Sequence, residues 1–148
     1  MKRILLAVDG SEHSYRAAAF AGELSFRFQS PVDVLNVVPE AAPIVPGAVH
    51  EYARLEDANL TQRDLLKSAG TEVVAIATAK VKETGGDVGN QEVAIGSPAH
   101  HIASYAEGAG ADCIVMGRRG LGDLKGLLMG SVSHRVGHLT NKTLVTVE

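Results

Sequence analysis

The stretch from Cys113 to Val132 constrains the fold of this chain most strongly. It opens with the apolar run Cys113–Met116, which is typical of a buried strand. Glycines recur after this run as far as Gly130, and a second apolar pattern begins at Val132. Glycine lets the backbone approach a ligand closely, and the free N–H groups at the start of a helix favour an anion. The stretch therefore predicts a strand, a phosphate-binding loop and a helix in succession.

The composition is that of one ordinary globular domain. The chain has 148 residues, of which 45% are hydrophobic and 21% charged, and this length can bury a core without disulfides. The net charge of −3 argues against a nucleic-acid-binding protein. The single cysteine, Cys113, excludes an internal disulfide and favours a reducing compartment. Because no apolar run suits a signal peptide or a membrane span, we expect a cytoplasmic protein that does not act at a membrane.

Apolar runs and helical patterns alternate along the whole chain. We expect strands at residues 4–8, 32–38, 88–95, 113–116 and 143–147, and helices at 12–28, 52–84, 98–108 and 131–139. The first strand–helix–strand unit implies a right-handed crossover and a parallel sheet. The order predicts a single α/β domain, doubly wound, with a five-stranded parallel sheet.

Local signals set the expected boundaries of the helices. Ser11 and Ser97 are placed as N-caps, and Pro98 follows at the first helical position. A proline-rich segment at 39–50 is expected to be a binding loop or lid, or a disordered connector. The next helix should run from near Tyr52 to Thr84, with Gly70 as a possible bend. Its predicted inner face consists of Leu55, Ala58, Leu66, Ala69, Val73 and Ile76.

The glycine-rich stretch fails the tests for two common phosphate-binding motifs. No glycine is followed by Lys and then Ser or Thr, so the P-loop is absent. Gly120–Gly122 begins the dinucleotide fingerprint, but Lys125 stands at its last glycine position. The pattern that fits is G-x2-G-x9-G-S, from Gly117 to Ser131.

With this spacing the chain resembles the universal stress protein family, in its ATP-binding branch. The resemblance covers essentially the whole chain, including residues 4–11, 111–117 and the loop through 133. It implies an adenine nucleotide α-hydrolase-like fold with sheet order 3-2-1-4-5, and ATP that carries Mg²⁺ or Mn²⁺. It also implies a homodimer through the last strand, Thr143 to Val147. The family often has proline where this chain has Ala7 and Thr143, and Thr143 restores an N–H group at the start of that strand.

The resemblance also names the expected nucleotide-binding residues. Asp9 is placed near the ribose or adenine side of the nucleotide, where a carboxylate can accept ribose hydroxyls or help to hold a phosphate-bound metal, with a turn-forming aspartate as the alternative. Val37 and Met116 either contact adenine or only pack in the core. Ser131 is either a phosphate ligand or a helix cap, and the two arginines contact phosphate or face water. The full set is Ala7, Asp9, Val37, Met116, Gly117, Arg118, Arg119, Gly120, Gly130, Ser131, Val132 and Ser133.

No catalytic or metal-binding constellation is apparent. His100 and His101 are adjacent and therefore do not share a helix face; all six histidines are interpreted as solvated or helix-end residues, and Cys113 as a buried, inert thiol. Three functions stay open. They are an ATP-binding regulatory stress protein, a slow ATPase or nucleotidyl-transfer enzyme with Asp9 as its candidate base, and an interaction module that binds no nucleotide.

Overall fold

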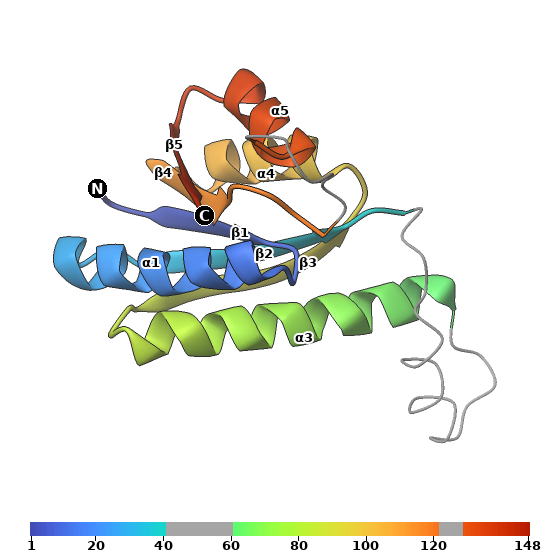
Figure 1. The fold of residues 1–148 in the computed structure, drawn as a ribbon, viewed down its shortest axis with the longest axis horizontal. Coiled ribbons are helices and arrows are strands. Elements are labelled where there is room, and N and C mark those ends of the chain that lie inside the picture. Colours follow the sequence, from blue (N-terminus) through green and yellow to red (C-terminus); the bar gives the residue numbers. More distant parts are fainter. Residues whose placement is uncertain (41–60, 122–128) are drawn as a thin grey trace.

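The structure is a computed structural model that describes residues 1–40, 61–121 and 129–148. Five parallel strands form its centre (Figure 1). The sheet order is β3-β2-β1-β4-β5, which confirms the predicted doubly wound α/β fold. The strands are β1 (Ile4–Val8), β2 (Val32–Val38), β3 (Val88–Ile95), β4 (Cys113–Gly117) and β5 (Thr143–Val147). The described helices are α1 (Glu12–Phe28), α3 (Gln62–Glu83), α4 (Pro98–Gly108) and α5 (Ser131–Leu139).

Helices cover both faces of the sheet. Helices α1 and α3 lie on one face, and α4 and α5 lie on the other (Figure 1). Strands β1 and β4 are buried along their whole length, because a strand between two helical layers has no solvent face. Strands β3 and β5 are the edges, as expected for β3 from its polar alternation. Within the described ranges, no helix combines the length and apolar character needed to cross a membrane.

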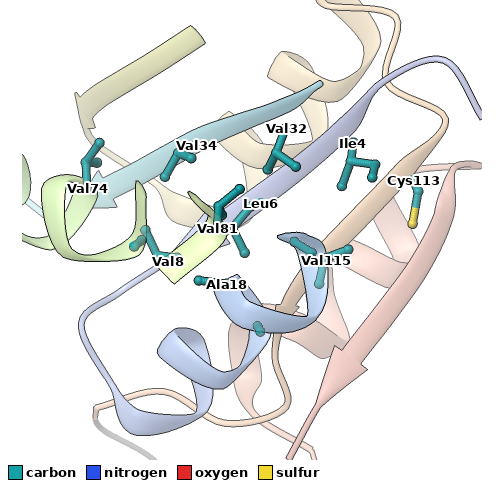
Figure 2. Close-up of a cluster of buried hydrophobic side chains, with 13 residues drawn as sticks. Ile4, Leu6, Val8, Ala18, Val32, Val34, Val74, Val81, Cys113 and Val115 are labelled. Carbon is teal, nitrogen blue, oxygen red and sulfur yellow. The ribbon is translucent and has the colours of Figure 1, made fainter. Parts of the chain in front are cut away.

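Alternate residues of the central strands supply two separate cores. Ile4, Leu6 and Val8 of β1 pack toward α1 and α3 in the cluster drawn in Figure 2. Leu5 and Ala7 pack on the opposite face, against α4 and α5. The register pairs Ala7 of β1 with Met116 of β4, so the carboxyl ends of these two strands lie side by side.

Two of the predicted helix starts are where the sequence placed them. Ser11 is the N-cap of α1, and its side chain accepts a hydrogen bond from the Ser14 N–H at 3.2 Å. Ser97 occupies the N-cap position of α4 and Pro98 the first helical position, although the Ser97 side chain makes no capping hydrogen bond. The backbone geometry of proline therefore starts α4 without help from the serine hydroxyl.

The predicted start of the long helix near Tyr52 is wrong. Helix α3 begins at Gln62, where Thr61 and Asp64 form a capping box. Thr61 is in an extended conformation (φ −78°, ψ 156°), which ends any helix that approaches it from the N-terminal side. Residues 52–60 and the loop at 41–50 lie outside the described residues. The Thr-x-x-Asp pattern at 61–64 is the sequence signal for this helix start.

The buried face of α3 is also offset from the predicted one. Leu66 is buried as expected, but Ala69 is exposed and Ile76 is 38% exposed. Leu55 and Ala58 lie outside the described residues. Gly70 neither bends nor interrupts the helix, and a Cβ there would lie 2.5 Å from Cγ1 of Val93. Small residues therefore let α3 approach the sheet closely, which counting large apolar residues does not reveal.

Candidate functional site

A cleft of about 500 Å³ lies at the carboxyl edge of the sheet, where β1, β2 and β4 end. The strand order reverses between β1 and β4 at this edge, and ligands of doubly wound sheets bind at such a point. The volume lies within the range of small-molecule sites. The residues that the sequence assigned to the site all line this cleft, with the exception of Arg118.

Asp9 follows β1 and holds the two sides of the cleft together. Its Oδ1 atom accepts a hydrogen bond from the Ser11 N–H at 3.0 Å, so the turn-forming role is present. Its Oδ2 atom accepts another from the Leu121 N–H at 3.1 Å, in the loop after β4. The carboxylate is half-buried and lines the cleft while it makes both contacts.

The first two glycines of the motif fit spaces that the fold itself leaves too small for a side chain. A Cβ on Gly117 would lie 2.8 Å from the backbone N of Ser14 and 2.9 Å from the carbonyl carbon of His13, in the first turn of α1. A Cβ on Gly120 would lie 2.5 Å from Oδ2 of Asp9. The sequence predicted these glycines from ligand approach alone. The structure adds a packing requirement that exists without any ligand.

The N-terminal turn of α5 forms another part of the cleft wall. Gly130 is the N-cap (φ −73°, ψ 158°), so the suggestion that Ser131 caps this helix is wrong. Ser131 is instead the first helical residue and is exposed. No side chain of the described residues caps α5. The first-turn amides of this helix therefore face the cleft edge without a side-chain acceptor.

Ser133 connects α5 to the loop that follows β4. Its buried hydroxyl lies 3.1 Å from the Arg118 carbonyl and 3.0 Å from the Gly130 carbonyl, and donates to them. The Gly130 N–H donates to the same Arg118 carbonyl at 2.8 Å. The hydroxyl of Ser133 thus fixes the shape of the cleft wall and is less available to a ligand than that of Ser131.

The floor of the cleft is apolar. Ala7, Val37 and Met116 are each buried and belong to the core beneath α4 and α5, yet each also lines the cleft. Val37 and Met116 therefore pack in the core and also line the cleft, and their contact with adenine stays a prediction.

The two neighbouring arginines lie in different surroundings. The guanidinium of Arg118 forms an ion pair with Glu148 at 3.2 Å and is not part of the cleft lining. Arg119 lines the cleft, and its buried Nε has no hydrogen-bond partner among the described residues. Arg119 is the arginine whose position suits an anionic ligand.

Sequence reasoning missed the part of the cleft formed by β2, α3 and α4. Asn36 of β2 is buried, and its Nδ2 donates to the Val8 carbonyl at 2.7 Å. Its position as a polar residue between the apolar pairs Val34–Leu35 and Val37–Val38 of a central strand was a usable signal. The contributions of α3 and α4 carried no comparable signal, because they depend on how these helices pack. The missed lining residues include Asn36, Leu66, Gly70, Val73, Pro98 and Ile102.

Acid–base and metal chemistry find little support at this edge. In the described part of the chain, no three His, Cys, Asp or Glu side chains are gathered to hold a metal ion. The pKa of Tyr15 is raised, first by burial of the phenol and then by the carboxylates of Glu72 and Asp9. Tyr15 therefore stays protonated at neutral pH.

The chain is similar to known proteins along its whole length. The sequence model of the universal stress protein family matches residues 1–148. Universal stress protein YxiE of Bacillus subtilis is 32% identical over 148 residues, which cover 98% of this chain and 97% of that protein.

Solved structures have the same fold. A universal stress protein in complex with cAMP superposes with a TM-score of 0.73 at 20% identity, over 99% of this chain and 97% of that one. The universal stress protein of Archaeoglobus fulgidus in complex with dAMP gives a TM-score of 0.70 at 20% identity, over 100% and 98%. At these identities the structures show the fold alone. The family match over the full length and the 32% identical relative show that this chain belongs to the universal stress protein family.

Proposed function

We propose that this chain binds ATP in the cleft and acts as a nucleotide-dependent regulatory module in a stress response. One observation carries the proposal: the same cleft is lined by two unlike surfaces. One is the apolar floor of Ala7, Val37 and Met116, and the other is the uncapped N-terminal turn of α5 with Arg119. An apolar floor suits a flat base, whereas helix amides and a guanidinium suit phosphates.

The phosphates are assigned to the start of α5. The positive end of the helix dipole and the first-turn amides lie there, and no side chain of the described residues takes their place. Ser131 adds an exposed hydroxyl at the first helical position. The buried Gly130 keeps the backbone at the cleft surface. The oxygens of a phosphate at this turn would accept hydrogen bonds from the first-turn N–H groups of α5, which have no side-chain acceptor among the described residues.

Asp9 is assigned to the ribose. Each carboxylate oxygen has two lone pairs, so the contacts to Ser11 and Leu121 leave capacity for a sugar hydroxyl. We assign Mg²⁺ or Mn²⁺ to the phosphates of the bound nucleotide. The described residues offer no cluster of three ligands for an ion of their own, and such ions commonly bind through substrate phosphates.

Proteins of the same fold support the choice of an adenine nucleotide. One was solved in complex with cAMP and another with dAMP, and both ligands contain adenine. Neither is a triphosphate. The choice of ATP therefore rests on the glycine pattern and on the anion-binding turn of α5.

The enzyme alternative needs a base or a water-positioning group. Asp9 is the candidate, but both its oxygens already accept backbone N–H groups, so the carboxylate is engaged in holding the turn and the loop. We therefore expect ATP turnover slower than about one per second, the low end of common enzyme rates. The third alternative, an interaction module without nucleotide, leaves the lined cleft without a role.

Equilibrium titration separates these functions. Calorimetry with ATP, and with AMP and GTP as controls, should give saturable ATP binding below millimolar concentration and weaker binding of both controls. The same sample, followed for phosphate release, should show only slow turnover. Absence of saturable ATP binding overturns the proposal, and fast turnover favours the enzyme.

We further propose that two copies pair through β5. This strand is a sheet edge, and such an edge is a template for pairing. The Thr143 N–H donates to Asp112 and the Val147 carbonyl accepts from Arg118, so these two residues face β4. By alternation, the backbone groups of Leu144 and Thr146 face outward. Thr143 therefore affects pairing within the sheet, not pairing between copies.

Sedimentation tests this pairing. At micromolar concentration the chain should sediment as a dimer, and Thr146→Pro, which removes an outward-facing N–H, should shift it to monomer. Thr146→Val keeps that N–H and serves as the control. A monomeric wild-type chain contradicts the proposal.

A further inference from the structure

We infer that His134 and His138 form a metal-binding pair on the exposed side of α5, and that Zn²⁺ is the ion their geometry fits. The two residues are four apart on one helix, so they share a face. Their Nε2 atoms lie 3.4 Å apart, and the ring centroids are 4.6 Å apart with an interplanar angle of 70°. The adjacent pair His100–His101 does not share a helix face in this way.

The separation of the two nitrogens is the one that tetrahedral zinc requires. Zn–N bonds of about 2.0–2.1 Å at a tetrahedral angle place two ligand nitrogens about 3.3–3.4 Å apart. The observed Nε2–Nε2 separation of 3.4 Å matches this spacing, and rotation of the rings about their side-chain bonds would aim both lone pairs at one ion. Imidazole nitrogen is also a preferred zinc ligand, whereas Mg²⁺ prefers oxygen.

The surroundings of the pair leave room for an ion. Both side chains are exposed, and His138 lies in the last turn of α5, where the helix dipole favours a cation. Without metal, one ring can donate its Nε2 hydrogen to the other. Arg135 is the nearest charged residue in the sequence; it precedes His138 by three residues and therefore lies beside it on the helix surface. No described carboxylate or thiol completes the set, so water or another exogenous ligand fills the remaining positions.

This site is separate from the cleft. Neither histidine belongs to the cleft lining, and an ion carried by a nucleotide would lie with its phosphates. The inference therefore does not depend on the proposed function. Bridging His134 and His138 would cross-link one turn of α5, a helix of nine residues with no side-chain cap from the described residues.

The test is a Zn²⁺ titration of the full chain without an affinity tag or nucleotide, in competition with a chromophoric chelator. Wild type should bind one ion per chain. His134→Ala and His138→Ala should each weaken binding at least about tenfold, because the second ligand no longer acts at high effective concentration. His100→Ala removes an exposed histidine of α4 and should leave the affinity unchanged.

Two further readouts keep the outcome clear. Circular dichroism without metal should show equal folding of all variants, since each changed side chain is exposed. Long-range ¹H–¹⁵N spectra of wild type with Zn²⁺ should show both rings as Nδ1–H tautomers, with Nε2 bound to metal. The inference is overturned if the wild type binds no Zn²⁺. It is also overturned if the His138→Ala variant binds Zn²⁺ as tightly as the wild type does.

Discussion

Oδ2 of Asp9 accepts a hydrogen bond from the backbone N–H of Leu121 at 3.1 Å, across 112 residues of sequence. This contact ties the end of β1 to the loop after β4, at the point where the strand order reverses. The same carboxylate accepts the Ser11 N–H and thus helps to form the turn into α1. One side chain therefore sets the relative position of three segments that border the cleft.

Replacing Asp9 with asparagine should weaken both contacts. The amide keeps one acceptor oxygen, but it presents an NH₂ group to the second backbone N–H. We expect Asp9→Asn to lower the free energy of unfolding by about 1–2 kcal/mol, measured by urea denaturation. Glu12→Gln is the control, because that side chain is 93% exposed and 3.5 Å from Arg16. Equal midpoints for Asp9→Asn and wild type would show that the carboxylate does not hold the loop.

A methyl group at Gly117 should force α1 away from β4. The added Cβ meets backbone atoms of His13 and Ser14, which cannot rotate aside. We expect Gly117→Ala to cost about 1–3 kcal/mol of stability in thermal or urea unfolding, even without ligand. At Gly108, at the end of α4, an added Cβ meets nothing within 4 Å. Gly108→Ala should leave the stability unchanged or slightly raised, and a similar loss in both variants would contradict the packing explanation.

The stability of the fold should carry an acid-sensitive contribution from Asp112. Hydrogen bonds from the backbone N–H of Lys2, and then of Arg3, lower the pKa of this carboxyl. A lowered folded-state pKa stabilises the fold above the unfolded pKa of about 3.9, and this contribution is lost as the pH falls through the folded value. Asp112→Asn should thus melt below wild type at neutral pH. Melting scans at decreasing pH should show the two converge below about pH 4, and a gap independent of pH would disprove the linkage.

Cys113 should be unreactive in the folded protein. Its side chain lies in the core under α1. Burial, and then the Asp112 carboxylate, raises the pKa of its thiol. A disulfide reagent at about pH 8 should label almost no thiol in native buffer and one per chain in denaturant, since only the thiolate reacts. Rapid labelling of the native protein would mean that this part of the core opens readily.

The sequence was sufficient for the sheet and for the side of the cleft formed by the ends of β1 and β4 and the start of α5. Buried strands such as Ile4–Val8 have a periodicity that local pattern reveals, and the spacing from Gly117 to Ser131 placed the loop between β4 and α5 correctly. The sequence revealed only part of the reason that glycine is needed in this loop. The contact of Gly117 with α1 depends on how a helix from the start of the chain crosses β4.

Features that depend on the packing of α3 could not be derived from pattern. Its buried stripe includes Gly70 and Thr78 and leaves Ile76 partly exposed, which reverses the usual ranking by hydrophobicity.

The different surroundings of the two arginines also depend on tertiary structure. Arg118 pairs with Glu148 because β5 runs beside β4, whereas Arg119 lines the cleft. The i, i+4 spacing of His134 and His138, by contrast, is a local pattern of the sequence.

The most direct test of phosphate binding at α5 is the ATP affinity of Ser131→Asp. A carboxylate at the first helical position favours the helix but repels a phosphate. The variant should therefore melt no lower than wild type, yet bind ATP at least about tenfold more weakly in calorimetry, through like-charge repulsion. Ser104→Asp, at an exposed position of α4 outside the cleft lining, adds the same charge and should bind as wild type does. Unchanged ATP affinity in a folded Ser131→Asp would contradict the assignment of the phosphates to α5.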